Sequence, residues 1–143
     1  ELVFLDMGAV YGGYHADMSR CVCVAPAPEQ SQRMLQAAQV MFEEALAAIR
    51  PGNLVRDIYR AAEEAAAREG FADDYMPNGL GHGLGLSLFE LPYLGADDDT
   101  VLEAGMIFAL EPMLVRYGVG TAVIEETVLV TRSGAETLSG KPW

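Results

Sequence analysis

The chain begins with a pattern of apolar runs and glycines that predicts a β-hairpin. Residues 2–5 and 14–24 are apolar, strand-like runs. The stretch 8–13, which contains two adjacent glycines, predicts the turn between them. This arrangement would place Asp6 and Asp17 on facing strands.

Two amphipathic helices are predicted next. The first should begin at Glu29 and keep a 3.6-residue apolar period until Pro51 and Gly52 end it. Asn53 is placed to cap a second helix, which should end near Gly70. Since each helix has one apolar face, we expect the two to pack on a common surface.

From Tyr75 onward the pattern changes to short apolar segments separated by glycines. The segments 79–88, 106–114, 122–131 and 136–138 predict strands. A hairpin, two helices and several antiparallel strands are typical of an α+β fold. We therefore expect an antiparallel sheet with the helices on one face.

Composition and charge narrow the classes of function. The 143 residues are enough for one packed core, so we expect a single domain over 1–143. The net charge of −12 argues against nucleic acid or an anionic membrane as partner, because both would be repelled. No apolar run approaches the ~20 residues of a membrane span and no leader is evident, so we expect a cytoplasmic protein. Cys21 and Cys23, two apart in a strand, should be free thiols.

Two aspartates of the predicted hairpin stand in an unusual setting. Asp6 lies in an otherwise apolar strand, where an ionised carboxylate is unfavourable unless a cation or hydrogen-bond donors compensate it. Asp6 and Asp17 are therefore either metal ligands or carboxylates satisfied by turn amides. Their spacing alone does not decide between these interpretations.

One histidine and two glutamates occupy similar positions later in the chain. His82 is flanked by glycines that leave room for a bound ion, although such a histidine is also common as a satisfied core or turn residue. Glu111 ends an apolar strand. In the pair Glu125 and Glu126, strand alternation sends the side chains to opposite faces. We expect Glu125 to point inward and Glu126 to be solvated.

Taken together, these residues form a set of four carboxylates and one imidazole. Oxygen ligands with one imidazole suit Mn²⁺, Co²⁺, Fe²⁺ or Zn²⁺, and four carboxylates balance the charge of two such ions. The sequence thus predicts a site for two divalent metal ions at Asp6, Asp17, His82, Glu111 and Glu125.

Several ordered motifs carry a family resemblance over nearly the whole chain. The chain resembles the pita-bread metallopeptidases, which include methionine aminopeptidase, aminopeptidase P, prolidase and creatinase. The resemblance implies that Asp6 chelates one metal, that His82 and Glu111 hold the other, and that Asp17 and Glu125 bridge them. The motifs are Leu-Asp-Met-Gly at 5–8, Tyr-His-Ala-Asp-Met-Ser-Arg at 14–20, Gly-His-Gly-Leu-Gly at 81–85, Leu-Glu-Pro at 110–112 and Ile-Glu-Glu-Thr-Val-Leu-Val-Thr at 124–131.

The same resemblance implies a reaction. Two cations about 3.5–4 Å apart can share a water, lower its pKa and polarise the scissile carbonyl. Glu111 would then act as the catalytic proton carrier, and His82 and the side chain at 89 would face the substrate. We expect a hydrolase of a peptide or small amide that resembles Xaa-Pro aminopeptidase or prolidase and is a homodimer at full length.

Three departures from the family pattern leave more than one function possible for this chain. Where the peptidases carry a second histidine in His-Glu-x-Pro, this chain has Phe89, followed by Glu-Leu-Pro, and loses a donor to the tetrahedral intermediate. Val123 stands where proline-specific members have arginine. We also expect that the first half of the catalytic domain, and any N-terminal domain, lie outside this sequence. A creatinase-like enzyme acting on a small metabolite, or a metal-free binding relative, are the alternatives.

Overall fold

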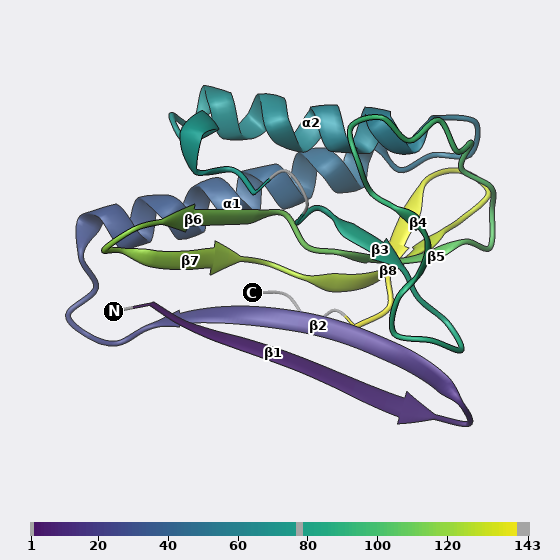
Figure 1. The fold of residues 1–143 in the computed structure, drawn as a ribbon, viewed down its shortest axis with the longest axis horizontal. Helices are drawn as coiled ribbons and strands as arrows, with labels where there is room; N and C mark the ends of the chain where they lie inside the picture. The colour runs from purple at the N-terminus through teal and green to yellow at the C-terminus, as the bar shows by residue number, and fades with distance from the viewer. Residues whose placement is uncertain (1, 77–78, 140–143) are drawn as a thin grey trace.

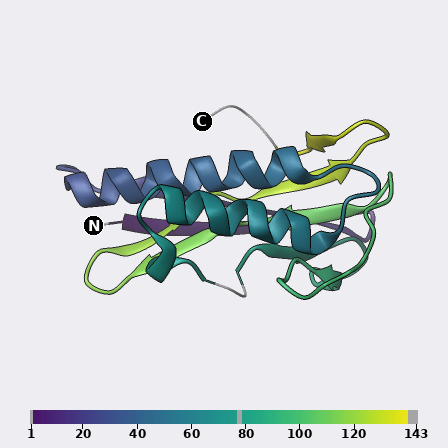
Figure 2. The ribbon, with the colours of Figure 1, turned by 90° about the horizontal axis from the view of Figure 1, so that it is seen from above.

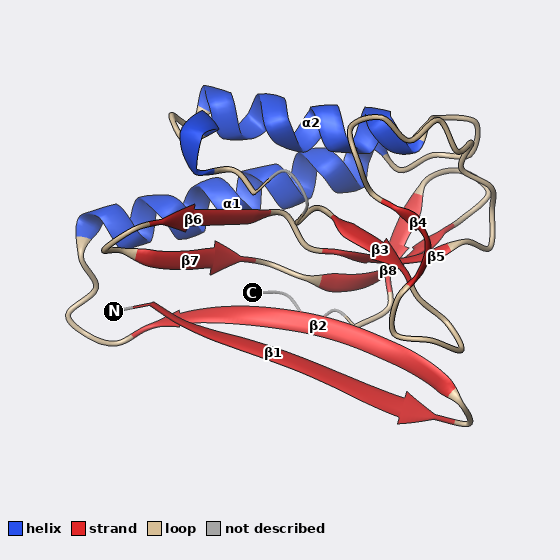
Figure 3. Ribbon diagram, viewed as in Figure 1, coloured by secondary structure: helices blue, strands red, loops and turns tan. Residues whose placement is uncertain are grey.

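The structure is a computed structural model that describes residues 2–76 and 79–139 (Figure 1). Two helices lie on one side of the strands, and a long hairpin runs along the other side (Figure 3). Seen from above, the helices lie side by side over the strands (Figure 2). This is the predicted α+β architecture, with helices on one face of antiparallel strands.

The hairpin consists of β1 (Leu2–Tyr11) and β2 (Tyr14–Cys23), which pair antiparallel along their whole length. The turn is shorter than predicted, because only Gly12 and Gly13 leave the ladder, at φ values of 59° and 89° that favour glycine. Asp6 pairs with Ser19, and Asp17 lies two residues before Ser19. Asp6 and Asp17 thus lie on facing strands, as predicted, and because side chains two apart share a face of a strand, the two also lie on the same face of the hairpin.

The two helices, α1 (Glu29–Ala48) and α2 (Val55–Arg68), pack on each other through their apolar faces. The predicted cap of α2 by Asn53 is wrong. The Asn53 amide instead donates to the carbonyl of Ala48 at 2.9 Å and so satisfies the end of α1. At the start of α2, the Asp57 carboxylate accepts the N–H of Leu54 at 2.9 Å.

The remaining strands form a five-stranded antiparallel sheet and a second hairpin. Two of the predicted strands are interrupted, the first at Glu111 and Pro112 and the second at Ile124 and Glu125. Both candidate glutamates therefore lie in irregular links between strands. The sheet has the strand order β4-β3-β5-β8-β9, with β3 (Gly81–Gly83), β4 (Glu90–Tyr93), β5 (Ile107–Leu110), β8 (Glu126–Val130) and β9 (Ala135–Thr137). The second hairpin pairs β6 (Met113–Arg116) with β7 (Gly120–Val123). A 3-10 turn, η1, spans Ala72–Asp74.

A close approach of two strands fixes the position of His82. Gly81 adopts a φ of 136°, and a Cβ atom built on it would lie 2.0 Å from the carbonyl oxygen of Ala109 on β5. Only glycine allows β3 to approach β5 this closely. The next residue, His82, pairs with Ala109 and is thereby held over the neighbouring strand.

The cysteines and the hydropathy agree with the sequence analysis. Cys21 and Cys23 are free thiols. Among the described residues, no helix is both long enough and apolar enough to cross a membrane.

Candidate metal centre

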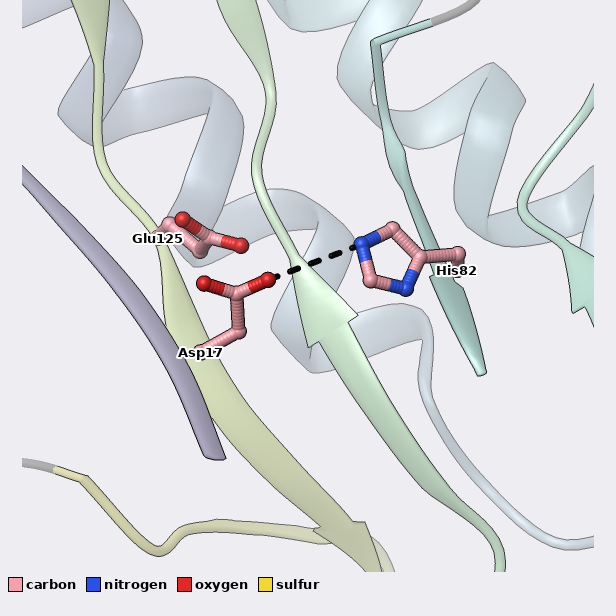
Figure 4. A group of neighbouring side chains, drawn as sticks. All are labelled: Asp17, His82 and Glu125. Atoms are coloured by element: carbon pink, nitrogen blue, oxygen red, sulfur yellow. Dashed lines mark ion pairs between the residues drawn. The ribbon is translucent and has the colours of Figure 1, made fainter. Parts of the chain in front are cut away.

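Three side chains from separate parts of the chain converge in the interior (Figure 4). Asp17 comes from β2, His82 from β3 and Glu125 from the link before β8. One ligand atom from each lies within 4.8 Å of the others, and all three residues are buried. The His82 Nε2 atom lies 3.8 Å from Asp17 Oδ2. The three have the spacing and donor types of a metal-ligand cluster.

The other two predicted ligands lie at the border of this cluster. Glu111, in the link between β5 and β6, places Oε1 3.7 Å from His82 Nε2. Asp6 is exposed on β1, but its charge still raises the pKa values of Asp17, Glu111 and Glu125. The structure thus brings all five predicted ligands into one neighbourhood, although Asp6 lies outside the group of three.

Burial and mutual repulsion make these carboxylates hard to ionise. Burial, followed by the charges of Glu125, Asp17 and Asp6, raises the pKa of Glu111 to about 8. Burial is also the largest cause that raises the pKa of Glu125 to about 7. The pKa of Asp17 is raised by burial and then by Asp6, although His82 opposes the shift. A divalent cation would remove both the desolvation and the repulsion, so the donor set fits a metal.

The Nδ1 nitrogen of His82 is hydrogen-bonded to the backbone. This atom lies 3.0 Å from the carbonyl oxygen of Gly83, to which it donates. In a neutral imidazole this contact leaves the lone pair of Nε2 directed at Asp17 and Glu111, which is the tautomer that metal-binding histidines adopt.

Polar contacts between β2 and the start of β8 hold two of the carboxylates, and sequence reasoning missed them. The Ser19 hydroxyl donates to Glu125 Oε2. Thr127 Oγ1 accepts from the Asp17 amide at 3.1 Å and donates to the Asp17 carbonyl at 2.9 Å. Sequence spacing could have pointed to Ser19 and Thr127, because each stands two residues after a candidate ligand and so shares its face of the strand.

Glu126 contradicts the prediction that it would be solvated. It is only 2% exposed, because β2 packs against β8 and because Arg20 and Ser139 lie against its carboxylate. Arg20 Nη2 donates to its Oε1 at 2.6 Å, and the Ser139 hydroxyl donates to its Oε2. Glu126 is thus a buried carboxylate with its own partners, outside the metal-ligand cluster.

Phe89 lies against the imidazole of the cluster. Its ring centroid is 4.3 Å from that of His82, with 49° between the ring planes, and 58% of the residue is exposed. The phenyl ring therefore covers one side of His82 and presents apolar surface to solvent. Val123, the other departure from the family pattern, is fully buried in β7 and adds nothing to this exposed surface.

Comparison with known proteins defines the class. Residues 1–132 match metallopeptidase family M24, and the chain belongs to that family, whose members are metal-dependent. The resemblance to the pita-bread metallopeptidases is thereby confirmed.

Several relatives have been named as dipeptidases. The chain is 33% identical over 139 residues to the Xaa-Pro dipeptidase of Pyrococcus furiosus, a match that covers 97% of this chain and 40% of the relative. It is 38% identical over 146 residues to the probable dipeptidase PepE of Mycobacterium tuberculosis, covering 99% of this chain and 38% of that protein. The chain thus spans about 40% of the length of the curated relatives it matches.

Solved structures show the same relationship. The prolidase from Pyrococcus furiosus superposes with a TM-score of 0.94 at 32% identity over 99% of this chain and 42% of that one. The dipeptidase PepE from Mycobacterium ulcerans gives a TM-score of 0.93 at 32% identity, over 99% of this chain and 38% of that one. The fold matches the C-terminal part of such prolidase structures. The N-terminal domain of the chickpea FACT complex subunit SPT16 also superposes, at 0.91 over 97% of this chain and 35% of that one, but at 16% identity this likeness shows the fold alone.

Proposed function

We propose that this chain forms the metal-binding part of a dinuclear hydrolase of the prolidase kind, which cleaves a peptide or small amide bond with a metal-activated water. The observation that carries the proposal is the buried convergence of Asp17, His82 and Glu125, with Glu111 3.7 Å from the His82 imidazole. The Xaa-Pro dipeptidases among its relatives support the choice of peptide substrate.

The ions would be held by Asp6, Asp17, His82, Glu111 and Glu125, and the donor set suits Mn²⁺, Co²⁺, Zn²⁺ or Fe²⁺. When bound, they would supply polarisation of the scissile carbonyl and activation of a water. Four carboxylates match the charge of two divalent ions, as the family resemblance also implies.

The chain's own residues would orient and protonate the reactants. Glu111 has a side chain that is 20% exposed and an Oε1 atom 3.7 Å from His82 Nε2, so its carboxyl lies at the border of the cluster, where it could accept and donate a proton. It is the candidate carrier of a proton from the attacking water to the leaving nitrogen. His82 and Phe89, whose rings are in contact, would form the adjoining wall for the substrate.

One observation favours a second candidate function. The exposed ring of Phe89 offers apolar surface where the peptidases of the family carry a hydrogen-bond donor. This surface would suit a creatinase-like enzyme that acts on another small amide or C–N bond. The homodimeric state and the cytoplasmic location stay predictions.

Metal content tests the proposal directly. The chain should bind two equivalents of Mn²⁺ in a calorimetric titration, and Asp17→Asn and Glu125→Gln should each lose most of the bound metal, because an amide neutralises neither ion. The control is Glu64→Gln on the exposed side of α2, which should bind as the unmodified chain does. Unchanged stoichiometry in both site variants would reject the bridging roles. If the unmodified chain binds no metal, a metal-free relative is the correct interpretation.

Substrate class needs a separate measurement on the metal-loaded protein. Xaa-Pro dipeptides and small non-peptide amides should be compared under the same conditions. Preferential turnover of the dipeptides supports the prolidase kind, whereas turnover of the other amides alone supports the creatinase-like candidate.

A further inference from the structure

We propose that Arg20 is a positioning residue of the metal centre, whose guanidinium selects Glu125 rather than Glu126 as the ligand. The proposal rests on the metal centre of the proposed function. Arg20 itself lies outside the predicted ligand set and has a side chain that is 21% exposed.

Among its contacts, the Arg20 guanidinium donates to oxygens of both β2 and the start of β8. Its Nη1 donates to the carbonyl of Ser19 at 2.8 Å and to the carbonyl of Glu125 at 2.9 Å. Its Nη2 donates to the carboxylate of Glu126 at 2.6 Å. One side chain therefore holds both the backbone of the ligand residue and the side chain of its neighbour.

These contacts matter because the two glutamates are alternatives for the same role. Glu125 and Glu126 are adjacent, and both are almost fully buried, at 1% and 2% exposed. Glu125 lies in the link before β8, where its carbonyl and N–H pair with the backbone of Ser19 at 3.4 and 3.3 Å and its carboxylate accepts from the Ser19 hydroxyl. Arg20 adds to the Ser19 contacts by holding the Glu125 carbonyl and the Glu126 carboxylate, which keeps Glu126 turned away while the Glu125 side chain is directed at Asp17 and His82.

The geometry of the contacts requires arginine. A planar guanidinium can donate to several oxygens in fixed directions, whereas an ammonium is a compact charge on a flexible stem. Lysine at position 20 would keep the ion pair with Glu126 but could not hold the same three oxygens at once.

Arg20→Lys is therefore the first test, with Mn²⁺ as the titrant. We expect the Kd for Mn²⁺ to rise about 10- to 100-fold, the usual effect of disturbing a residue that orients metal ligands. The melting temperature of the metal-free chain should stay near that of the unmodified chain, because the charge pair is kept.

A second variant separates positioning from stability. Arg20→Met/Glu126→Gln removes both charges of the pair, so no buried carboxylate is left without a partner. If Arg20 served only the fold, this variant would recover both the melting temperature and the Mn²⁺ affinity. Positioning predicts that the fold recovers while the Kd stays at least about 10-fold weaker than in Glu126→Gln.

The matched control is Arg116, which is also paired with a carboxylate whose side chain is only 10% exposed, because its Nε and Nη2 both donate to Asp74. Arg116→Lys should leave the Mn²⁺ affinity unchanged. A Kd within about twofold of the unmodified value in Arg20→Lys, or a full recovery in the double variant, overturns the positioning role alone. If the unmodified chain fails to bind Mn²⁺, the proposed function falls together with this proposal.

Discussion

Raising the pH should destabilise the metal-free chain, because the folded state retains protons that the unfolded chain has already released. The pKa of Glu111 is about 8 in the folded chain, against an ordinary value of 4.5, and that of Glu125 is about 7. A carboxyl group with a raised pKa contributes its full stability below pH 4.5 and loses it as the pH rises through the folded value.

The size of the effect follows from the same values. For Glu111, the difference between 4.5 and about 8 corresponds to about 5 kcal/mol, at roughly 1.4 kcal/mol for each pH unit. The contribution of Glu125 is smaller and does not simply add, because the charge of Glu125 raises the pKa of Glu111 and the charges of Asp17 and Asp6 raise both. A loss of several kcal/mol is a large share of the ~5–15 kcal/mol that stabilises a typical domain.

Urea unfolding followed by circular dichroism, on chain stripped with a chelator, measures this loss between about pH 5 and about pH 9. Glu111→Gln should flatten most of the slope, since an amide does not titrate. Glu64→Gln, at an exposed position of α2, should keep the slope of the unmodified chain. Added Mn²⁺ should restore stability at the alkaline end, because it binds the ionised carboxylates.

Two results would refute this reasoning. Equal free energies of unfolding at both ends of the pH range would show that the carboxylates are not crowded as the structure indicates. The same slope in Glu111→Gln and in the unmodified chain would show that the protons are released elsewhere.

Two further predictions concern the surroundings of His82. Gly81→Ala should destabilise the chain by roughly 3 kcal/mol or more in urea unfolding, because its φ is 136° and the new Cβ would meet the carbonyl of Ala109. The control is Gly134→Ala, where a Cβ atom meets nothing. Equal stability of the two variants would contradict the close approach of β3 and β5. Phe89→Ala should weaken Mn²⁺ binding roughly 2- to 10-fold by removing the ring that packs on His82, whereas Phe89→Tyr should retain it. Calorimetry measures both affinities, and an alanine variant that binds like the tyrosine variant argues against the ring contact.

Local patterns were sufficient for much of the fold. The helices could be predicted because apolar residues with a 3.6 period are bounded by Pro51 and Gly52 and by Gly70, and the hairpin because two glycines separate apolar runs. The interruption at Glu111 had a local signal in Pro112, and the sequence indicates that Glu111 ends a strand, whereas the interruption at Ile124 and Glu125 had no such signal. This second break depends on which strand each half joins, and that is decided by contacts between distant residues.

In the site, too, some features could be predicted from the sequence and others could not. The five candidate ligands could be proposed from residue type and setting, and the structure brings them into one neighbourhood. The burial of Glu126 could not be predicted, because alternation assumes that one face of the strand is exposed to solvent, whereas β2, from the other end of the chain, packs against β8. Spacing places Ser19 and Thr127 on the same face as a candidate ligand, but the contacts of Ser19, Arg20 and Thr127 join residues more than 100 positions apart, and no local pattern encodes those contacts.

The contacts between β2 and the start of β8 also bear on the order of folding. Ser19 and Glu125, which share a hydrogen bond, are 106 residues apart, so the two ends of the described chain must meet before the cluster exists. Closing so long a loop is entropically costly and is expected to be a late event. Metal capture then becomes a final step, which holds the first hairpin to the last strands and slows its local opening.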